Sequence, residues 1–337
     1  MLVENKTFQV LLQNFFLKWM MGQKKVSPST IQNYKDTFRI LFVYLSEVHG
    51  VNPSSVNMDL INADTIIGFL RYLERDRKNS LKTVNNRLAA IKSFIDYMSY
   101  ECPEYSEVIR KIKRIPFRKC EKKEICYLTK EEIDSLLNSC EINTAEGRRD
   151  YLMLLLLYNS GMRVSEMISI RRRDIFFSDN GKCHLRVMGK GRKERVIPLW
   201  KSTTKYLANF IHEHQIDDND YLLLGRNVSH LTRSGVRYRI DCIAKRAIKN
   251  SPSLMGKSIT PHVFRHSTAM SLLQSGIDIS TIALWLGHES IETTHQYMVA
   301  DLKLKEAALN KLHEPKVNGE NNRYQASGDI LEFLNSL

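Results

Sequence analysis

The chain has 337 residues, a formal net charge of +13 and six scattered cysteines. This length is sufficient for two domains with separate hydrophobic cores. No apolar run approaches the ~20 residues that span a bilayer, and the first ten residues contain Glu4 and no small-residue cleavage site. We therefore expect neither a membrane anchor nor a secretion signal. The excess of positive charge suits a polyanionic partner, although charge alone does not establish one.

The cysteines argue for a reducing compartment. They lie at positions 102, 120, 126, 140, 183 and 242, and the one close pair has neither a matching second pair nor a histidine partner for zinc. We expect free thiols, a cytoplasmic location and no bound metal.

Residues 1–110 predict an N-terminal bundle of four amphipathic helices. The expected helices cover residues 8–21, 27–50, 62–75 and 81–100. On the fourth helix, Lys82, Asn85 and Asn86 lie off the apolar side. Taken alone, such polar residues usually form a solvated face.

A strongly basic segment follows and is the predicted linker, residues 111–127. It contains Lys113, Arg114 and Arg118, and Pro116 interrupts any helix. A basic linker could follow the phosphates of a nucleic acid. It could equally be an exposed tether, and the two interpretations are compatible.

Residues 128–313 predict a second domain that begins with a helix and then forms a small antiparallel sheet. Thr129 and Glu132 form a capping-box pattern, and a buried helix over residues 149–160 ends at Gly161. Asn180-Gly181 is a strong hairpin turn. It precedes alternating apolar residues at 183–187 and a second turn, Gly189-Lys190-Gly191, that leads into a strand over 195–199.

Helices are expected again over residues 203–214 and 232–250, and the second of these is basic. In the next segment, Thr260-Pro261 is typical of a helix start, which places His262 and Arg265 on one helical face. Gly287 ends a further short helix, His288 follows at once, and Tyr297 comes nine residues later. Residues 314–337 predict a polar linker and a last amphipathic helix.

These side chains suit metal-free cleavage of a phosphodiester, which requires a nucleophile, positive charge on the non-bridging oxygens and a proton for the leaving oxygen. Tyr297 is the candidate nucleophile, with only ~0.1% of a normal phenol ionised at neutral pH. Arg163 and Arg265 are permanently charged forks that match two phosphate oxygens. Lys190, at a glycine-flanked turn, is the candidate proton donor. His262 and His288 would carry protons or donate hydrogen bonds to the phosphate.

The same segments resemble the tyrosine recombinase (phage integrase) family. The resemblance rests on GMRVSE, VMGKGRKERVIPL, TPHVFRHS and LGH followed by a tyrosine, and it covers residue 128 to about residue 312. It implies that the catalytic residues are Tyr297, Arg163, Lys190, His262, Arg265 and His288, with Glu166 as an accessory acid. Met162, Phe264 and Gln296 depart mildly from the family pattern, and none of these departures removes a reacting group.

The resemblance also implies a fold and a set of partners. We expect a mainly α protein with a small antiparallel β-sheet, in which an N-terminal helical core-binding domain joins a C-terminal catalytic domain. The implied substrate is double-stranded DNA with inverted-repeat core sites, held by a homotetramer on two duplexes. Exchange would pass through a 3′-phosphotyrosyl link and a Holliday junction, without cofactor, metal or ATP. Candidate DNA contacts are Lys82, Asn85, Asn86, Lys113, Arg114, Arg118, Arg192, Arg233 and Arg237.

Other interpretations remain at this stage. Singly, an arginine after a helix end is often an ion-pair partner, a lysine at a turn is usually solvated, and a tyrosine is usually a core or surface phenol. A relaxing enzyme of the type IB topoisomerase kind shares this chemistry, but the HxxR and LGH segments and the N-terminal bundle disfavour it. A DNA-binding protein that no longer cuts is disfavoured because every catalytic position is filled. Integration, excision, transposition and resolution remain equally open.

Overall fold

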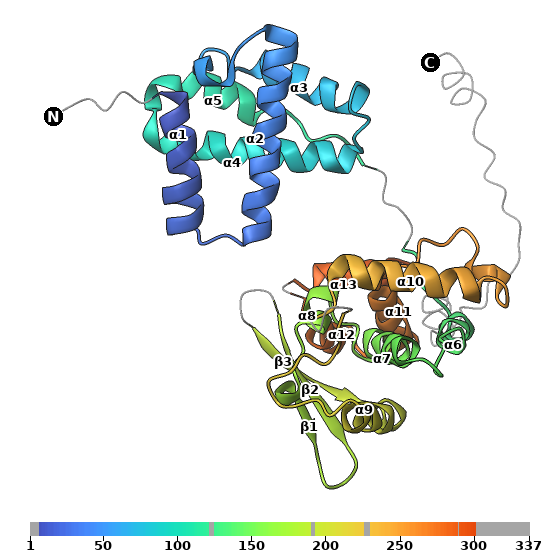
Figure 1. Ribbon diagram of the computed structural model, residues 1–337. Helices are drawn as coiled ribbons and strands as arrows, with labels where there is room; N and C mark the ends of the chain where they lie inside the picture. Colours follow the sequence, from blue (N-terminus) through green and yellow to red (C-terminus); the bar gives the residue numbers. More distant parts are fainter. Residues whose placement is uncertain (1–6, 121–124, 190–192, 226–229, 289, 301–337) are drawn as a thin grey trace, which may run out of the picture. The chain divides into compact units, whose positions relative to one another are not determined.

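The computed structural model describes residues 7–120, 125–189, 193–225, 230–288 and 290–300 (Figure 1). The chain divides into two compact units, residues 1–123 and 124–337, and each has a hydrophobic core of its own. The described residues are mainly helical, with a three-stranded antiparallel sheet in the second unit. The predicted fold class is therefore confirmed.

The first unit is helical throughout and contains the four helices that the sequence predicts, with the first continuing as a π-helix. In chain order its described elements are α1 (Phe8–Asn14), the π-helix η1 (Phe15–Gln23), α2 (Pro28–His49), the 3-10 turn η2 (Pro53–Ser55), α3 (Ala63–Arg75), α4 (Leu81–Glu101), the 3-10 turn η3 (Pro103–Tyr105) and α5 (Ser106–Lys113).

Side-chain caps and aromatic packing explain this arrangement. Ser27 and Ser80 cap α2 and α4 by accepting hydrogen bonds from backbone N–H groups three residues later, which satisfies donors that a helix start leaves unpaired. In the core, the ring of Phe94 meets those of Phe15 and Phe38 edge to face, with centroids 5.3 and 5.4 Å apart. Such pairs stabilise a core beyond the area that they bury.

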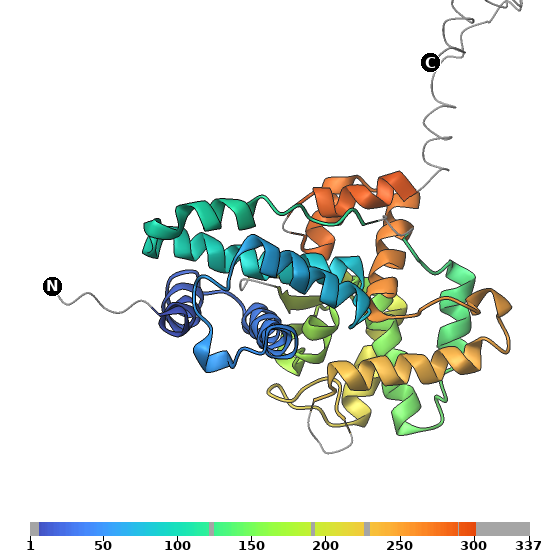
Figure 2. The same cartoon turned by 90° about the horizontal axis from the view of Figure 1, so that it is seen from above.

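Helix α5 was not among the predicted helices. It packs beside α4 (Figures 1 and 2) because Ile109 and Ile112 are buried, while its basic residues lie on the opposite face. The lysine at its end, Lys113, pairs with Asp96 of α4 at 2.7 Å. The first three residues of the predicted linker are therefore helical and belong to the first unit, and residues 121–124 of that linker lie outside the described residues.

The second unit contains the sheet and the candidate catalytic residues that the sequence singles out. Its described elements are α6 (Lys130–Asn138), α7 (Ala145–Ser160), α8 (Val164–Ile168), the 3-10 turn η4 (Arg172–Asp174), β1 (Ile175–Phe177), β2 (Cys183–Met188), β3 (Glu194–Leu199), α9 (Lys201–Glu213), α10 (Arg233–Ala247), the 3-10 turn η6 (Pro252–Leu254), α11 (Pro261–Gln274), α12 (Ile279–Leu286) and α13 (Glu292–Ala300).

The sheet forms where alternating apolar residues and the Asn180-Gly181 turn predict it. The strand order is β1-β2-β3, and Leu185 of β2 faces Ile197 of β3. Since side chains alternate between the two faces of a strand, the odd-numbered residues of β2 are buried against the core. Gly181, with φ 73°, supplies the left-handed residue of the turn between β1 and β2.

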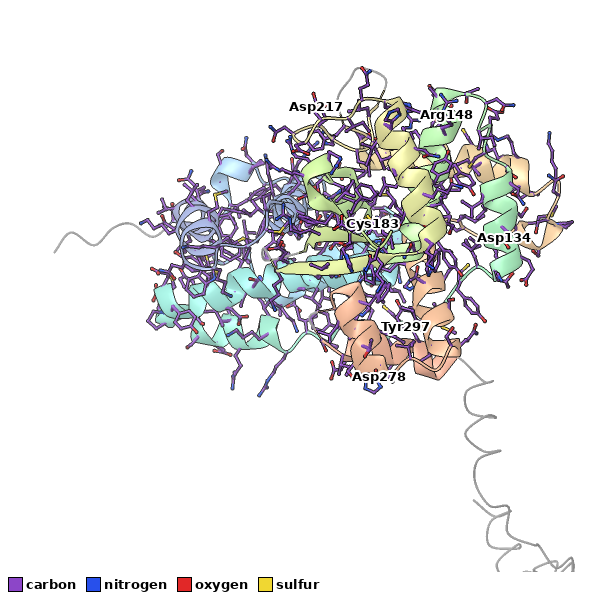
Figure 3. All side chains as sticks on the ribbon, turned by 90° about the horizontal axis from the view of Figure 1, so that it is seen from below. Asp134, Arg148, Cys183, Asp217, Asp278 and Tyr297 are labelled. Atoms are coloured by element: carbon purple, nitrogen blue, oxygen red, sulfur yellow. The ribbon has the colours of Figure 1, made fainter. Side chains whose placement is uncertain are left out.

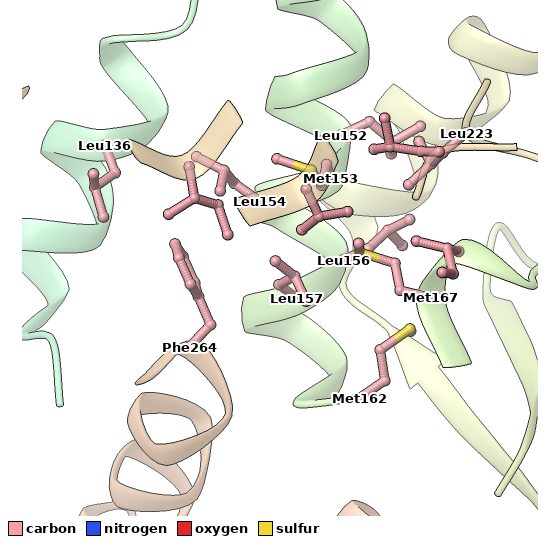
Figure 4. Packing of buried hydrophobic residues seen from close by; sticks show 14 of the residues in the cluster. Leu136, Leu152, Met153, Leu154, Leu156, Leu157, Met162, Met167, Leu223 and Phe264 are labelled. Atoms are coloured by element: carbon pink, nitrogen blue, oxygen red, sulfur yellow. The ribbon is translucent and has the colours of Figure 1, made fainter. Parts of the chain in front are cut away.

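Helix α7 is the centre of the second core. Its run of leucines and methionines is buried, as length and composition predict, and Figure 4 shows Phe264 of α11 pointing into the same cluster. Thr144 caps α7, which begins at Ala145, four residues before the predicted start at Arg149. Because α7 and α11 pack together, residues at the end of α7 and in the first turns of α11 become neighbours.

Several expectations concern features away from the site. The six cysteines are free thiols. No helix among the described residues is long and apolar enough to cross a membrane. Residues 301–337, which include the predicted last helix, lie outside the described residues.

Candidate active site

Arg163 follows a sharp turn at the end of α7. The turn is made by Gly161, whose φ of 59° is left-handed, and a Cβ on this residue would lie 2.5 Å from Cδ2 of Leu286. Glycine therefore allows α7 to end directly against α12. Arg163 then caps α8, and its Nη2 donates a hydrogen bond to the carbonyl oxygen of Gly287 at 3.3 Å.

Arg265 is buried and its guanidinium joins two helix ends. Its Nη1 donates to the carbonyl oxygen of Gly161 and its Nη2 to that of Leu286, both at 2.8 Å. The side chain has an exposed fraction of 4%. Burial, and then the neighbouring charge of Arg163, lower the pKa of Arg265 to about 10. The residue therefore remains a cation at neutral pH, held in place by backbone acceptors at the ends of α7 and α12.

Glu166 joins two arginines. Its carboxylate accepts from the backbone N–H and Nη1 of Arg163, both at 2.9 Å, and from Nη2 of Arg195 at 2.6 Å. Burial alone would raise the pKa of Glu166, but the hydrogen bonds from Arg195 and Arg163 outweigh it and hold the pKa below its ordinary value. Arg195 also donates from Nε to the carbonyl oxygen of Trp285 at 3.1 Å. One buried carboxylate thus fixes α8, β3 and the end of α12 relative to one another.

Two predicted histidines border these arginines. His288 follows Gly287, which ends α12 with φ 66°, and its Nδ1 lies 2.7 Å from Oγ1 of Thr294. Burial, followed by the charges of Arg265 and Arg163, lowers the pKa of His288 to about 4. Desolvation and the same two arginines also lower the pKa of His262. Both rings are therefore neutral at neutral pH, each with one donor and one acceptor nitrogen.

Tyr297 lies among α11, α12 and α13 and is 1% exposed (Figure 3). Its hydroxyl oxygen is 2.9 Å from Nδ1 of His266. Its ring is nearly parallel to that of His288, with centroids 6.5 Å apart. The phenol also interacts electrostatically with Arg265. The candidate nucleophile therefore shares one neighbourhood with the buried arginine and two imidazoles.

The structure thus brings together six of the seven predicted catalytic residues: Arg163, Glu166, His262, Arg265, His288 and Tyr297. Lys190 and Arg192 lie outside the described residues. The described base of their hairpin is close by, because a Cβ on Gly189 would lie 3.8 Å from Oε1 of Glu166. Among the described residues, no group of three or more histidine, cysteine or acidic side chains could hold a metal ion.

Some of the predicted DNA-contact residues have exposed side chains, and others form hydrogen bonds or ion pairs within the chain. Lys82, Asn86, Arg114, Arg233 and Arg237 are exposed, and Arg237 pairs only across its own helix with Asp241, at 3.0 Å.

Asn85 and Arg118 are engaged within the first unit. The Asn85 amide both donates to the carbonyl oxygen of Arg118 and accepts from its N–H, each at 2.8 Å. The Arg118 guanidinium binds Glu74 at 2.7 Å. These two side chains therefore anchor residues around 118 to α3 and α4 instead of lying free for a phosphate.

Two residues at the site were not predicted. Arg195 stands in the predicted strand 195–199 on the same face as buried Ile197, but strand periodicity does not identify the distant acid with which it pairs. His266 stands one helical turn after His262, and this i, i+4 spacing is a local signal that could have indicated a shared face. Its contact with Tyr297 joins residues 31 positions apart, which spacing along the chain does not specify.

Comparison with known proteins agrees with this geometry. Residues 126–303 match the phage integrase family, and residues 14–101 match the N-terminal SAM-like domain of phage integrases. The chain belongs to the phage integrase family of tyrosine recombinases. This tyrosine recombinase is 42% identical to a putative integrase/recombinase, y4rC, of Sinorhizobium fredii over 97% of each chain. It is 31% identical to the tyrosine recombinase XerC of Chlamydia muridarum, over 88% of this chain and 96% of that one.

Solved structures share the fold. The XerH site-specific recombinase bound to a palindromic difH substrate matches with a TM-score of 0.67 and 21% identity, over 86% of this chain and 81% of that one. The Tn1549 transposon integrase in complex with a circular intermediate DNA matches with a TM-score of 0.68 and 18% identity, over 90% and 99%. At such identities the likeness extends to the fold of this tyrosine recombinase and no further.

Proposed function

We propose that this tyrosine recombinase acts on specific DNA sites by cutting and rejoining one strand at a time through a 3′-phosphotyrosyl link to Tyr297, without metal or ATP. The observation that carries the proposal is the convergence of the Tyr297 hydroxyl with Arg265, Arg163 and two neutral imidazoles. A phenol, fixed cations and hydrogen-bond donors around one point match what phosphoryl transfer demands.

The arginines would stabilise the charge that develops on the non-bridging oxygens. Arg265 uses two of its five N–H donors on carbonyl oxygens, so its orientation is fixed before DNA arrives. Arg163 is held by Glu166 and has a side-chain exposed fraction of 32%, which leaves it accessible to a ligand. Preorganised donors of this kind lower a barrier because they need no reorganisation during reaction.

The remaining side chains would handle protons. Lys190 is proposed to protonate the departing 5′ oxygen, which is consistent with a hairpin base that adjoins Glu166. His262 and His288, neutral before DNA binds, would donate hydrogen bonds to the phosphate. Glu166 would act by holding Arg163 and Arg195.

The proposed partner is double-stranded DNA with inverted-repeat core sites, bound by four protomers on two duplexes that pass through a Holliday junction. The structurally similar XerH recombinase is bound to a palindromic substrate. This supports the proposal that the DNA site of this chain is an inverted repeat. Exposed Lys82, Asn86, Arg114, Arg233 and Arg237 are the proposed phosphate or base contacts, with Arg192 beside the catalytic lysine. We further propose that residues 1–110 bind the DNA as a separate domain, that residues 128–313 form the catalytic domain, and that residues 314–337 dock on a neighbouring protomer.

The test is covalent trapping on DNA. Duplexes that bind the full chain are selected from a random-sequence pool, and a nick is placed near the cleavage point so that the leaving strand diffuses away. We expect the wild type to accumulate a protein–DNA adduct and Tyr297→Phe to form none while binding the same duplex. Adduct formation by Tyr297→Phe, or its absence from the wild type, would overturn the proposal.

Two further assays separate the competing activities. Exchange between two labelled duplexes is expected from a recombinase, whereas relaxation of a supercoiled plasmid without exchange would indicate an enzyme of the type IB topoisomerase kind. Truncation before Glu314 is expected to preserve cleavage of a single duplex and to weaken synapsis. Unchanged synapsis and exchange by the truncated chain would contradict docking of the tail on a neighbour.

A further inference from the structure

The contact between His266 and Tyr297 joins a histidine of unassigned role to the reacting oxygen. His266 lies on α11 directly after Arg265, and its Nδ1 is 2.9 Å from the phenolic oxygen, within the range of a good hydrogen bond. The two ring centroids are 5.6 Å apart and the ring planes are tilted by 60°. At this distance the phenol can donate its hydrogen to Nδ1, the contact that direct proton transfer requires.

The surroundings of His266 keep its ring neutral. Burial, and then the charges of His262 and Arg265, lower its pKa. Two residues from other elements face His266, namely Tyr297 of α13 and His288, which follows α12. The ring of His288 is also neutral. A neutral imidazole has one acceptor nitrogen, and proton transfer from Tyr297 requires the tautomer in which Nδ1 accepts from the Tyr297 hydroxyl.

Other proton acceptors nearby are already engaged. The Glu166 carboxylate binds Arg163 and Arg195 through both of its oxygens. His288 directs its Nδ1 to Thr294. His266 thus combines direct contact with the phenol and an acceptor that no charged donor occupies in the described contacts.

We propose that His266 is the general base for the nucleophile: its Nδ1 takes the phenolic proton as the oxygen of Tyr297 bonds to phosphorus. This inference rests on the proposed function. In cleavage, the Tyr297 O–H bond breaks as N–H and O–P bonds form, while the P–O5′ bond breaks and the 5′ oxygen takes a proton from the separate acid assigned to Lys190. In rejoining, the 5′ oxygen bonds to phosphorus and gives its proton back to Lys190, while the bond from phosphorus to the Tyr297 oxygen breaks and His266 returns its proton to that oxygen.

Substrate binding strengthens this base. Without DNA, burial, and then His262 and the cation of Arg265, disfavour a proton on His266 and lower its pKa, and a phenol with an ordinary pKa near 10 does not transfer its proton to such a ring. A phosphodiester anion seated between the arginines opposes their charge and makes protonation of His266 easier. The base is therefore weak until the scissile phosphate is in place, which limits ionisation of the nucleophile to the loaded site.

The closing experiment measures single-turnover cleavage of the nicked duplex as a function of pH. His266→Asn keeps an acceptor oxygen close to the position of Nδ1 but cannot take a proton. We expect it to cleave about 10²–10⁴-fold more slowly, with a rate that rises about tenfold per pH unit as hydroxide replaces the base, up to the phenol's own pKa near 10. His295→Asn on the exposed side of α13 is the matched control and should retain the wild-type rate and pH profile.

A substrate with sulfur at the bridging 5′ position separates the two proton transfers, because a thiolate leaves without an acid. We expect this substrate to restore the rate of Lys190→Ala but not that of His266→Asn, and we expect added imidazole to raise the rate of His266→Ala. A wild-type rate and profile for His266→Asn would overturn the proposal, as would rescue of this variant by the sulfur substrate.

Folding and the proposed function are controlled independently. Melting temperature and duplex binding are measured for each variant, and His266→Gln replaces His266→Asn if the latter melts early. Loss of rate in both variants in proportion to loss of folded protein, with an unchanged pH profile, counts against a base. If the wild type forms the Tyr297-dependent adduct, the proposed function stands even where His266 proves dispensable.

Discussion

The two units of the chain bury different kinds of side chain. In the described part of the first unit, the buried polar residues are the threonines Thr37 and Thr65, and the core is aromatic and aliphatic. Among its described residues, the second unit buries four charged side chains: Glu132, Asp150, Glu166 and Arg265. Burial of a charge costs free energy unless it is paired and hydrogen-bonded. The second unit therefore loses free energy to the burial of charged side chains, and the described part of the first unit does not.

Each buried acid of the second unit links elements that are distant in sequence. Glu132 of α6 binds Lys257 at 2.7 Å, and Asp150 of α7 binds Arg239 of α10 at 2.6 Å. Glu166 holds Arg163 and Arg195 in the same way. Hydrophobic packing positions a helix, but a charged pair also specifies the direction of one side chain. Of these pairs, those made by Glu166 fix the charged side chains of the candidate site, whereas those of Glu132 and Asp150 join elements away from it.

The largest effect on stability is expected from Asp150→Asn. This change leaves half-buried Arg149 and Arg239 beside a neutral, fully buried amide and should lower the free energy of unfolding by about 3–5 kcal/mol. Asp241→Asn, which breaks an exposed pair on α10, should cost under about 1 kcal/mol. Urea unfolding followed by hydrogen exchange in each unit provides the measurement. Equal costs for the two variants would contradict the role given to the buried acid.

Arg265→Lys tests the fixed guanidinium. An ammonium cannot donate to the carbonyl oxygens of Gly161 and Leu286 and also present a fork to a phosphate. We expect adduct formation to fall by about 10²–10³-fold, with duplex binding largely retained. Arg148→Lys, on the opposite end of α7, is the control. Adduct formation by Arg265→Lys within a factor of three of the wild type would show that charge alone is sufficient.

A smaller, pH-dependent loss of stability should be confined to the second unit. The pKa of His288 is about 4 in the folded chain and about 6.5 when unfolded. The unfolded chain therefore binds a proton first as the pH falls through 6.5, and stability is lost down to about pH 4, by roughly 3 kcal/mol. Replacement by glutamine, His288→Gln, should remove the part of the loss due to His288, while His262 and His266, whose pKa values are also lowered, keep theirs. Hydrogen exchange at pH 7 and pH 5 resolves the two units, and an equal response of both would refute the assignment.

The smallest effect is expected in the first unit. Lys113 and Asp96 form a pair at 2.7 Å, with side chains that are 40% and 55% exposed. Lys113→Ala should change the free energy of unfolding by less than about 1 kcal/mol. It should also reduce duplex affinity more at low than at high salt if Lys113 contacts phosphate. A duplex affinity and salt dependence equal to those of the wild type would exclude Lys113 as a phosphate contact.

Local signals account for what was predicted from the sequence. Thr129 and Thr260 cap helices as their spacing indicates, and Gly161 and Gly287 end helices in left-handed conformations because these features depend on a few neighbouring residues. Helix α5 was not predicted because its basic composition hid the buried spacing of Ile109 and Ile112.

The gathering of the catalytic candidates was predicted through family motifs and not through spacing. No local rule brings Gly161, Arg265 and Leu286 together, since packing of α7 against α11 and α12 does so. The pairing of His266 with Tyr297 and of Arg195 with Glu166 arises from the same tertiary packing. The residue types were visible in the chain, but their partners were set by the fold.

The pairing of β2 with β3 limits how this hairpin can change. Val187 faces Arg195, and Arg195 points to Glu166 while its neighbour Val196 is 61% exposed. Insertion of one residue at the start of β3 would shift the register by one and exchange the two faces of the strand. Arg195 would then enter solvent and lose Glu166, and exposed Val196 would turn to the inner face in the place of Ile197. Length changes in this hairpin should therefore be accommodated in its turn or in steps of two residues.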